Sequence, residues 1–166
     1  MRLIGAILIF CGALWGYMKY RAQVMLPLRL ARALAGDLAV LRSGVCVNRR
    51  PLPALLAREL SEGIGAQYVW IPFTNALACS AEGTGMTARD CWTQVVDGLP
   101  SPLSVWLLPL GALLGSGGEI LGQAIDEVRE ELLCYVHTGE ERRSEQLKLS
   151  AALCFSGACF VVLLLL

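Results

Sequence analysis

Charged residues are scarce in this sequence. They account for 17% of its 166 residues, whereas soluble globular domains carry about 25%. Hydrophobic residues reach 55%, and the formal net charge is zero. Because the chain has no overall basic excess, we expect no nucleic-acid partner. The length fits one domain of ordinary size, so the apolar excess calls for an explanation other than a large core.

Side chains that carry chemistry are also few. His137 is the single histidine of the sequence, and Cys134 precedes it by three positions. On a helix these two residues share a face. Two ligands do not make a zinc site, and a cysteine nucleophile needs an orienting partner as well. We therefore expect no enzyme activity, no cofactor and no metal. A membrane enzyme that uses this pair is the weaker hypothesis.

The seven cysteines form no C-x-x-C pair, which is the spacing typical of metal-binding and thiol–disulfide motifs. Free cysteine packs as a small hydrophobic side chain. We therefore expect all seven to be reduced. Three of them lie in uncharged apolar stretches near the two ends, namely Cys11, Cys154 and Cys159.

Long uncharged stretches lie at both ends of the sequence. Residues 3–18 and residues 149–166 contain no Asp, Glu, Lys or Arg. As α-helices they would span about 24 and 27 Å, close to the ~30 Å hydrocarbon core of a bilayer. We therefore predict transmembrane helices over residues 1–20 and 149–166, with a helical domain over residues 21–148.

Basic residues flank both stretches on the side nearer the middle of the chain, and aromatic residues lie at that end of the first stretch. Aromatic rings prefer the headgroup level, and long basic side chains reach it by extending along the helix. Seven basic residues lie on this side, against Arg2 alone on the other. The positive-inside rule then places the middle segment in the cytoplasm and both termini outside. The expected membrane-anchoring residues are Trp15, Lys19, Arg21, Arg142, Arg143 and Lys148.

Two alternatives to membrane spans are less favoured. A cleaved signal peptide needs small residues before its cleavage site, but the first stretch ends in bulky Trp15, Tyr17 and Met18. A buried core helix is the alternative for the second stretch. That stretch is uncharged and ends on four leucines, with no polar face. Uncleaved membrane anchors explain both ends better.

Charge is distributed unevenly despite the zero total. Residues 1–58 carry nine basic residues and one acidic residue, Asp37, whereas residues 59–148 carry thirteen acidic and five basic ones. The two parts can neutralise each other within one domain, which is the favoured interpretation. The alternative is a dipolar module that stacks head to tail or binds a charged partner. As a side hypothesis, the basic residues between positions 19 and 58 could contact anionic lipid.

Between the two ends, apolar residues recur every three or four positions, which indicates helices, and strand signals are missing. The sequence therefore predicts an all-α helical bundle. Leu30, Leu34, Leu38, Leu41 and Val45 form one such stripe, and Ile120, Ala124, Val128, Leu132 and Tyr135 form another. The predicted helices are Val24–Val47 with Pro27 in its first turn, Ala54–Glu62, Gln67–Ser80, a Thr87-capped helix to Asp97, an apolar core segment Leu103–Leu114, a helix to His137 and Glu140–Lys148.

Glycine and proline mark the turns between these helices. Pro51, Leu52 and Pro53 are expected to set the shape of the turn that opens the second helix. Gly83-Thr84-Gly85-Met86-Thr87 lacks the spacing and the lysine of a phosphate loop, so a glycine turn with a Thr87–Asp90 capping box is the better interpretation. Further capping boxes are expected at Ser116–Glu119 and Thr138–Glu141.

Three passages resemble the stage III sporulation protein AB family. The opening Met1-Arg-Leu-Ile-Gly-Ala-Ile-Leu-Ile is similar to the family's anchor. The turn Arg50-Pro51-Leu52-Pro53-Ala54-Leu55-Leu56 is similar to its T-P-L-P-E-A-L turn, with Arg50 in place of Thr and Ala54 in place of Glu. Gly111, Leu114-Gly115, Gln123 and Ile125 resemble its L-x-x-x-G-x-x-L-G…Q…I passage, although Gly117-Gly118 departs from the family's polar turn.

This resemblance implies a role that composition does not give. Such proteins are similar to the cytoplasmic domains of the inner-membrane platform of type II secretion systems and type IV pili. The resemblance implies a scaffold in the mother-cell membrane, within a secretion-like channel to the forespore. Other stage III sporulation membrane proteins and a partner ATPase are the implied partners. A two-span accessory or regulatory subunit unrelated to sporulation is the alternative.

Overall fold

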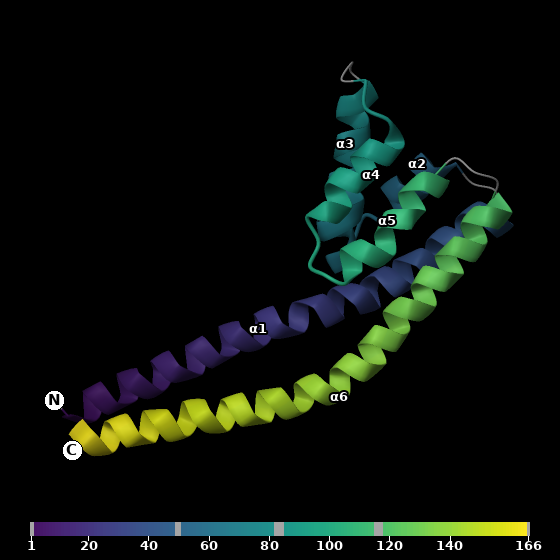
Figure 1. The fold of residues 1–166 in the computed structure, drawn as a ribbon. Coiled ribbons are helices and arrows are strands. Elements are labelled where there is room, and N and C mark those ends of the chain that lie inside the picture. Colours follow the sequence, from purple (N-terminus) through teal and green to yellow (C-terminus); the bar gives the residue numbers. More distant parts are fainter. Residues whose placement is uncertain (1, 49–50, 82–84, 115–117, 166) are drawn as a thin grey trace. The chain divides into compact units, whose positions relative to one another are not determined.

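The structure is a computed structural model that describes residues 2–48, 51–81, 85–114 and 118–165. The side chains of residues 2–4, 6–9, 47, 162, 164 and 165 are outside this description. Every regular element in the described ranges is helical, so the predicted all-α fold is confirmed (Figure 1). The chain divides into two compact units, a terminal unit of Met1–Leu28 with His137–Leu166 and a central unit of Arg29–Val136. The predicted domain boundaries at residues 20 and 148 refer to a membrane and stay a prediction.

Two long helices reach from one unit into the other along the chain. They are α1 (Arg2–Arg42) and α6 (Gly118–Leu165). The predicted helix start near Val24 is therefore wrong, because Pro27 lies inside α1 rather than in a first turn. The predicted capping box at Thr138–Glu141 is wrong as well, because α6 runs through it without a break. One missing N–H does not end a helix whose neighbouring turns are already formed, since helix extension is cooperative.

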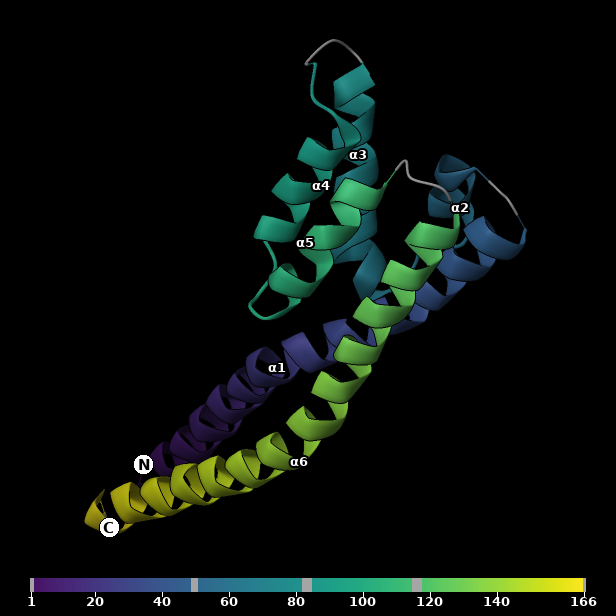
Figure 2. The same cartoon turned by 45° about the vertical axis from the view of Figure 1, so that its right-hand side comes forward.

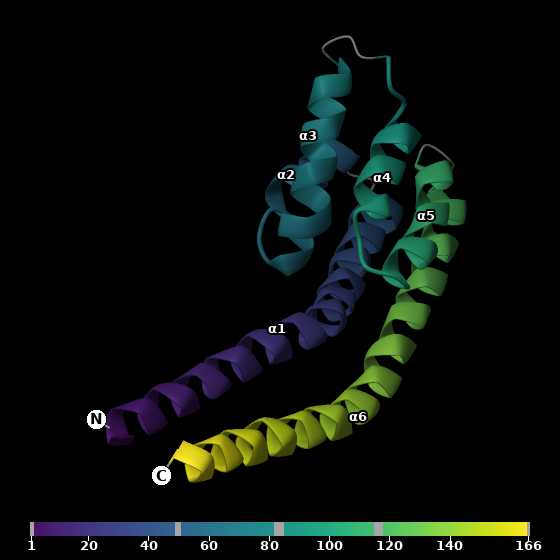
Figure 3. The ribbon, with the colours of Figure 1, turned by 60° about the vertical axis from the view of Figure 1, so that its left-hand side comes forward.

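The central unit contains the shorter helices. A π-helical turn η1 (Ser43–Val47) continues α1, and α2 (Leu52–Arg58) follows. A second π-helical turn η2 (Ala66–Trp70) leads directly into α3 (Ile71–Cys79), which α4 (Ala88–Asp97) and α5 (Leu103–Leu113) follow. Within this unit α4 lies against both α3 and α5, and α3 and α4 run side by side in opposite directions (Figures 2 and 3).

The turn before α2 contains the three residues expected to set its shape. Pro51 is the N-cap residue of α2, with an extended backbone, and Leu52 and Pro53 lie in the first turn of the helix. The carbonyl of Pro51 accepts from the backbone N–H of Ala54 at 3.0 Å. A proline in this position loses no hydrogen bond, because the first N–H groups of a helix have no intrahelical acceptor. The preceding turn residues Arg49 and Arg50 lie outside the described residues.

The core of the central unit follows most of the predicted apolar stripes. Leu30, Leu34 and Leu38 are fully buried, and Leu41 is nearly so. Three aromatic residues from three elements meet in this core: the rings of Phe73 and Trp92 form an edge-to-face pair with centroids 5.1 Å apart, and Trp70 lies 5.8 Å from Trp92. The indole N–H of Trp92 donates to the carbonyl of Leu107 at 2.8 Å, which ties α4 to α5.

Two core predictions differ from the structure in detail. Ile120 was expected to face inward, but it is 56% exposed, whereas Leu121 and Ile125 are buried in the core. The apolar segment Leu103–Leu114 was expected to fill the core, yet α5 buries only one face and leaves Val105 65% exposed. A helix buries about a third of its circumference against one neighbouring layer, so an apolar segment can still have an exposed face.

The structure also tests the predicted caps. Thr87 and Asp90 form the expected capping box at the start of α4, with the Thr87 N–H donating to Asp90 at 2.9 Å and the Asp90 N–H donating to Thr87 at 3.3 Å. The Thr87 hydroxyl, which donates to the Asp90 carboxylate at 2.7 Å, and the Thr87 N–H together hold the pKa of that carboxyl below its usual value. The cap expected at Ser116, and Gly83-Thr84 of the glycine turn, lie outside the described residues.

Candidate functional site

The terminal unit is a pair of antiparallel helical segments. The first part of α1 and the last part of α6 run side by side in opposite directions in all three ribbon views (Figures 1–3). We call these segments the arms. Three contacts fix their register: the Leu28 side chain packs over Gly139, Arg143 donates to the Val24 carbonyl at 2.6 Å, and Tyr17 donates to the Leu147 carbonyl at 3.4 Å. Positions earlier in α1 therefore meet positions later in α6.

This register places four of the predicted anchoring residues close together along the arms. Because Tyr17 meets Leu147, the neighbouring Trp15 and Lys19 of α1 lie at about the level of Lys148 of α6. Lys19 extends over the Trp15 ring, with its ammonium nitrogen 4.4 Å from the ring centroid. Arg21 is exposed beside them. Whether these residues contact a membrane stays a prediction.

Arg142 and Arg143 differ from the other four predicted anchors. They lie more than one helical turn away, at the level of Val24, because Arg143 reaches the carbonyl of that residue. Arg142 is exposed, whereas Arg143 is half-buried and directed at α1. Sequence patterns do not distinguish the two arginines, because the partner of Arg143 is far away along the chain.

Large apolar side chains cover the outer surface of both arms. On α1 they include Trp15, which is 65% exposed, and Met18, which is 62% exposed. On α6 they include Leu153 at 72% and Phe160 at 65%, whereas Leu147 and Ala158 are buried. Exposed apolar side chains on both helices make the arms a candidate contact surface. Within the described residues, no helix combines the length and the apolar character that crossing a membrane requires.

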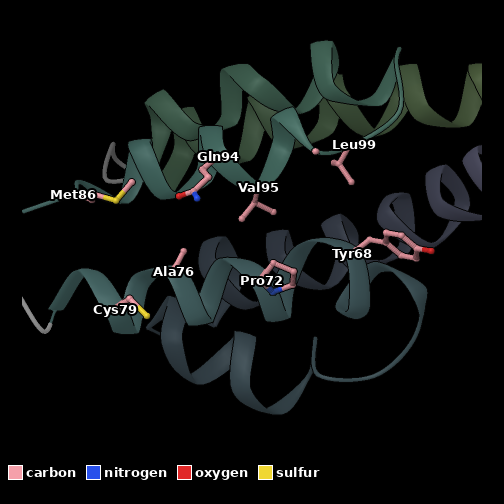
Figure 4. Close-up of a pocket in the computed structure, with 9 residues that line it drawn as sticks. Tyr68, Pro72, Ala76, Cys79, Met86, Gln94, Val95 and Leu99 are labelled. Carbon is pink, nitrogen blue, oxygen red and sulfur yellow. The ribbon is translucent and has the colours of Figure 1, made fainter. Parts of the chain in front are cut away.

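A second feature lies inside the central unit, between α3 and α4. Figure 4 shows this groove, whose volume is about 510 Å³. One wall comes from η2 and α3, and the other comes from α4 and the residues at its two ends. Gln94 is the one amide in an otherwise largely apolar lining, so the groove suits apolar side chains rather than charged ligands. The lining residues are Tyr68, Pro72, Ala76, Cys79, Met86, Gln94, Val95, Gly98 and Leu99.

This groove was not predicted from the sequence. Its α3 wall was visible in principle, because Tyr68, Pro72, Ala76 and Cys79 recur every three or four positions on the face opposite the buried Phe73 stripe. Nothing in the sequence, however, indicated that α4 would leave an open space next to this face of α3.

A half-buried carboxylate links two elements of the central unit. Asp37 of α1 accepts a hydrogen bond from the Trp70 indole N–H at 2.7 Å. Burial raises the pKa of the Asp37 carboxyl above its ordinary value, and the hydrogen bond from Trp70 opposes this rise. A Cβ at Gly65 would collide with the Asp37 carboxylate, so only glycine fits there. These contacts join α1 to the start of the η2–α3 segment, which is a structural role.

An ion pair in the central unit reflects the charge asymmetry of the sequence. Arg42 near the end of α1 forms an ion pair with Asp126 of α6, with a 2.7 Å separation. The pair joins the basic first part of the chain to its acidic second part. It agrees with the interpretation that the two parts neutralise each other within one domain.

The residues considered for chemistry do not form a constellation. Cys134 and His137 are both exposed on α6. In the part of the chain that the structure describes, no group of three or more His, Cys, Asp or Glu side chains could hold a metal ion. The arm pair is therefore the best-supported candidate functional site.

Comparison with known protein families gave a match over nearly the whole chain. The model of the stage III sporulation protein AB family matches residues 2–166, which is the family that the anchor, the Pro-Leu-Pro turn and the glycine–glutamine passage resemble. This match links the chain to sporulation. No curated protein and no solved structure matched the chain.

Proposed function

Because the chain belongs to the stage III sporulation protein AB family, we propose that it is a non-enzymatic membrane scaffold of the channel between mother cell and forespore. The two arms cross the mother-cell membrane, and the central unit lies in the cytoplasm. The observation that carries this proposal is the arm pair, whose outer surfaces bear exposed Trp15, Met18, Leu153 and Phe160. A bilayer would cover this apolar surface without a protein partner.

The position of the membrane surface follows from the register of the arms. Trp15 and Lys19 of α1 share a level with Lys148 of α6, and from there both arms continue as uncharged sequence. Aromatic and basic side chains at one level are typical of the membrane–water interface. We place the cytoplasmic surface of the membrane at this level, which leaves Arg142 and Arg143 on the aqueous side.

A charge substitution on the exposed face of α6 tests the membrane proposal. Phe160 is 65% exposed and lies in the uncharged stretch, and an arginine near the centre of a spanning helix costs about 3 kcal/mol of insertion free energy. We expect Phe160→Arg to lower the fraction of protein that stays in alkali-washed membranes and to reduce spore formation. Gln146→Arg adds the same charge at an exposed position before Lys148 and serves as the control. Equal membrane retention of both variants would contradict the proposal.

The topology is tested separately. With both termini outside, protease added to sealed cells should leave residues 22–147 intact and digest them only after the membrane is opened. Digestion of this segment in sealed cells would contradict a cytoplasmic central unit. We further propose that other stage III sporulation membrane proteins, including an ATPase, bind the scaffold. Affinity purification of the tagged chain from sporulating cells, after mild crosslinking, is expected to recover them.

The two alternative functions have direct tests. An accessory subunit unrelated to sporulation would leave spore formation intact when the gene is deleted, and membership of a sporulation family already disfavours this alternative. A membrane enzyme that uses Cys134 and His137 would lose its function when both residues are replaced by alanine. We expect this double variant to sporulate normally.

A further inference from the structure

Pro27 opens a gap in the backbone hydrogen bonding of α1, where the two arms meet. A proline inside a helix has no N–H and its ring pushes against the carbonyl four residues earlier, which here belongs to Gln23. The next carbonyl along α1 is that of Val24. It accepts a hydrogen bond from the Arg143 guanidinium at 2.6 Å. A side chain of α6 therefore donates to the turn of α1 that proline has weakened.

A close packing contact lies one turn away from this hydrogen bond. On α1, Leu28 follows Val24 by four residues, and on α6, Gly139 precedes Arg143 by four residues. The tip of the Leu28 side chain lies 2.6 Å from the place where a Cβ of residue 139 would stand. Leu28 is 4% exposed. The two contacts therefore occupy successive turns of both helices in the same antiparallel register.

We propose that Arg143 is a positioning residue that clamps the proline-weakened turn of α1 to α6, with Gly139 as the recess that lets the helices approach. A hydrogen bond from a charged donor is shorter and stronger than one between neutral groups, in agreement with the 2.6 Å distance. The clamp fixes the spacing between α1 and α6 at this turn. Because both contacts are internal to the terminal unit, the clamp does not depend on the proposed membrane function.

The neighbouring Arg142 provides a matched control. It carries the same charge on the same turn of α6 but is exposed. The measurement is amide hydrogen–deuterium exchange, followed by mass spectrometry, on the full-length protein in a mild detergent. We expect Arg143→Ala to speed exchange in peptides that cover residues 21–31 by about fivefold or more, the effect of losing one such hydrogen bond. Arg142→Ala should leave these peptides unchanged, and Arg143→Lys, which keeps a charged donor, should restore part of the protection.

Exchange in the central unit separates a clamp from a general effect on folding. Peptides that cover residues 88–97 should exchange at the wild-type rate in all variants, because α4 lies outside the terminal unit. Gly139→Leu should reproduce the effect of Arg143→Ala, since a side chain there would push Leu28 and α1 away. Equal exchange at residues 21–31 in Arg143→Ala and Arg142→Ala would overturn the proposal. Faster exchange in α4 as well as in the arms would also overturn the proposal.

Discussion

Two glycine-to-alanine substitutions in the central unit should differ in their effects on stability. Gly111 lies inside α5 and is buried, and a Cβ there would collide with the indole ring of Trp92. Gly36 lies inside α1, is exposed, and has no atom within 4 Å of its would-be Cβ. Both sites are helical, so alanine gains the same helix propensity at each, about 1 kcal/mol. The difference between the two variants therefore isolates the cost of the collision.

The collision at Gly111 cannot be relieved cheaply, because several contacts hold the Trp92 ring. Its N–H donates to the Leu107 carbonyl at 2.8 Å, Phe73 packs edge-on at 5.1 Å, and the side chain is 1% exposed. Overpacking of this kind costs about 1–3 kcal/mol. We expect Gly36→Ala to stabilise the central unit by up to about 1 kcal/mol. Gly111→Ala should lie about 1–3 kcal/mol below Gly36→Ala.

Thermal unfolding of the full-length protein in detergent, followed by circular dichroism, measures this difference. For a unit of about a hundred residues, 1 kcal/mol shifts the midpoint by about 4 °C. Gly36→Ala should melt slightly above the wild type and Gly111→Ala clearly below Gly36→Ala. If both variants melted at the same higher temperature, the ring would not be fixed as described, and the reasoning from aromatic packing would fail.

Three further predictions concern the same unit. Burial raises the pKa of Asp37 above 3.8, so the stability contributed by the protonated carboxyl is fully present below that pH and is lost as pH rises through the raised pKa. Asp37→Asn should flatten this decline of the unfolding midpoint across a pH series, and an unchanged slope would contradict the prediction. Thr87→Ala removes one side of the α4 cap and should cost about 1 kcal/mol in chemical denaturation; no loss would mean that the cap does not stabilise α4. Leu132→Ala creates a core cavity and should cost about 2–5 kcal/mol, whereas Leu133→Ala, at a 43% exposed neighbour, should change the midpoint little.

Local sequence signals predicted those parts of the fold that depend on nearby residues. The stripe of Leu30, Leu34 and Leu38 repeats at the helical period, and its burial needs only that one face of the helix meets a core. The capping box of Thr87 and Asp90 spans four residues and formed as expected. In both cases the determining interactions lie within one or two turns of chain.

The errors arose where distant residues decide the outcome. Pro27 and Thr138 looked like helix boundaries, but both lie inside long helices. Leu28 and Gly139 pack together beside them, and such tertiary contacts override local preferences. In the candidate site, too, features set by nearby residues were predicted and features set by distant residues were not. The anchoring residues were visible as a pattern of aromatic and basic residues, whereas the separate position of Arg143 depends on Val24, which is far away in sequence.

The register of the arms also places two cysteines of different helices at the same level. Tyr17 meets Leu147, and Cys11 lies six residues before the former while Cys154 lies seven residues after the latter, so both thiols lie at nearly the same height along the pair. Both are exposed. A thiol-reactive probe attached to either cysteine would therefore report on the environment at the same level of the arm pair, from two different helices.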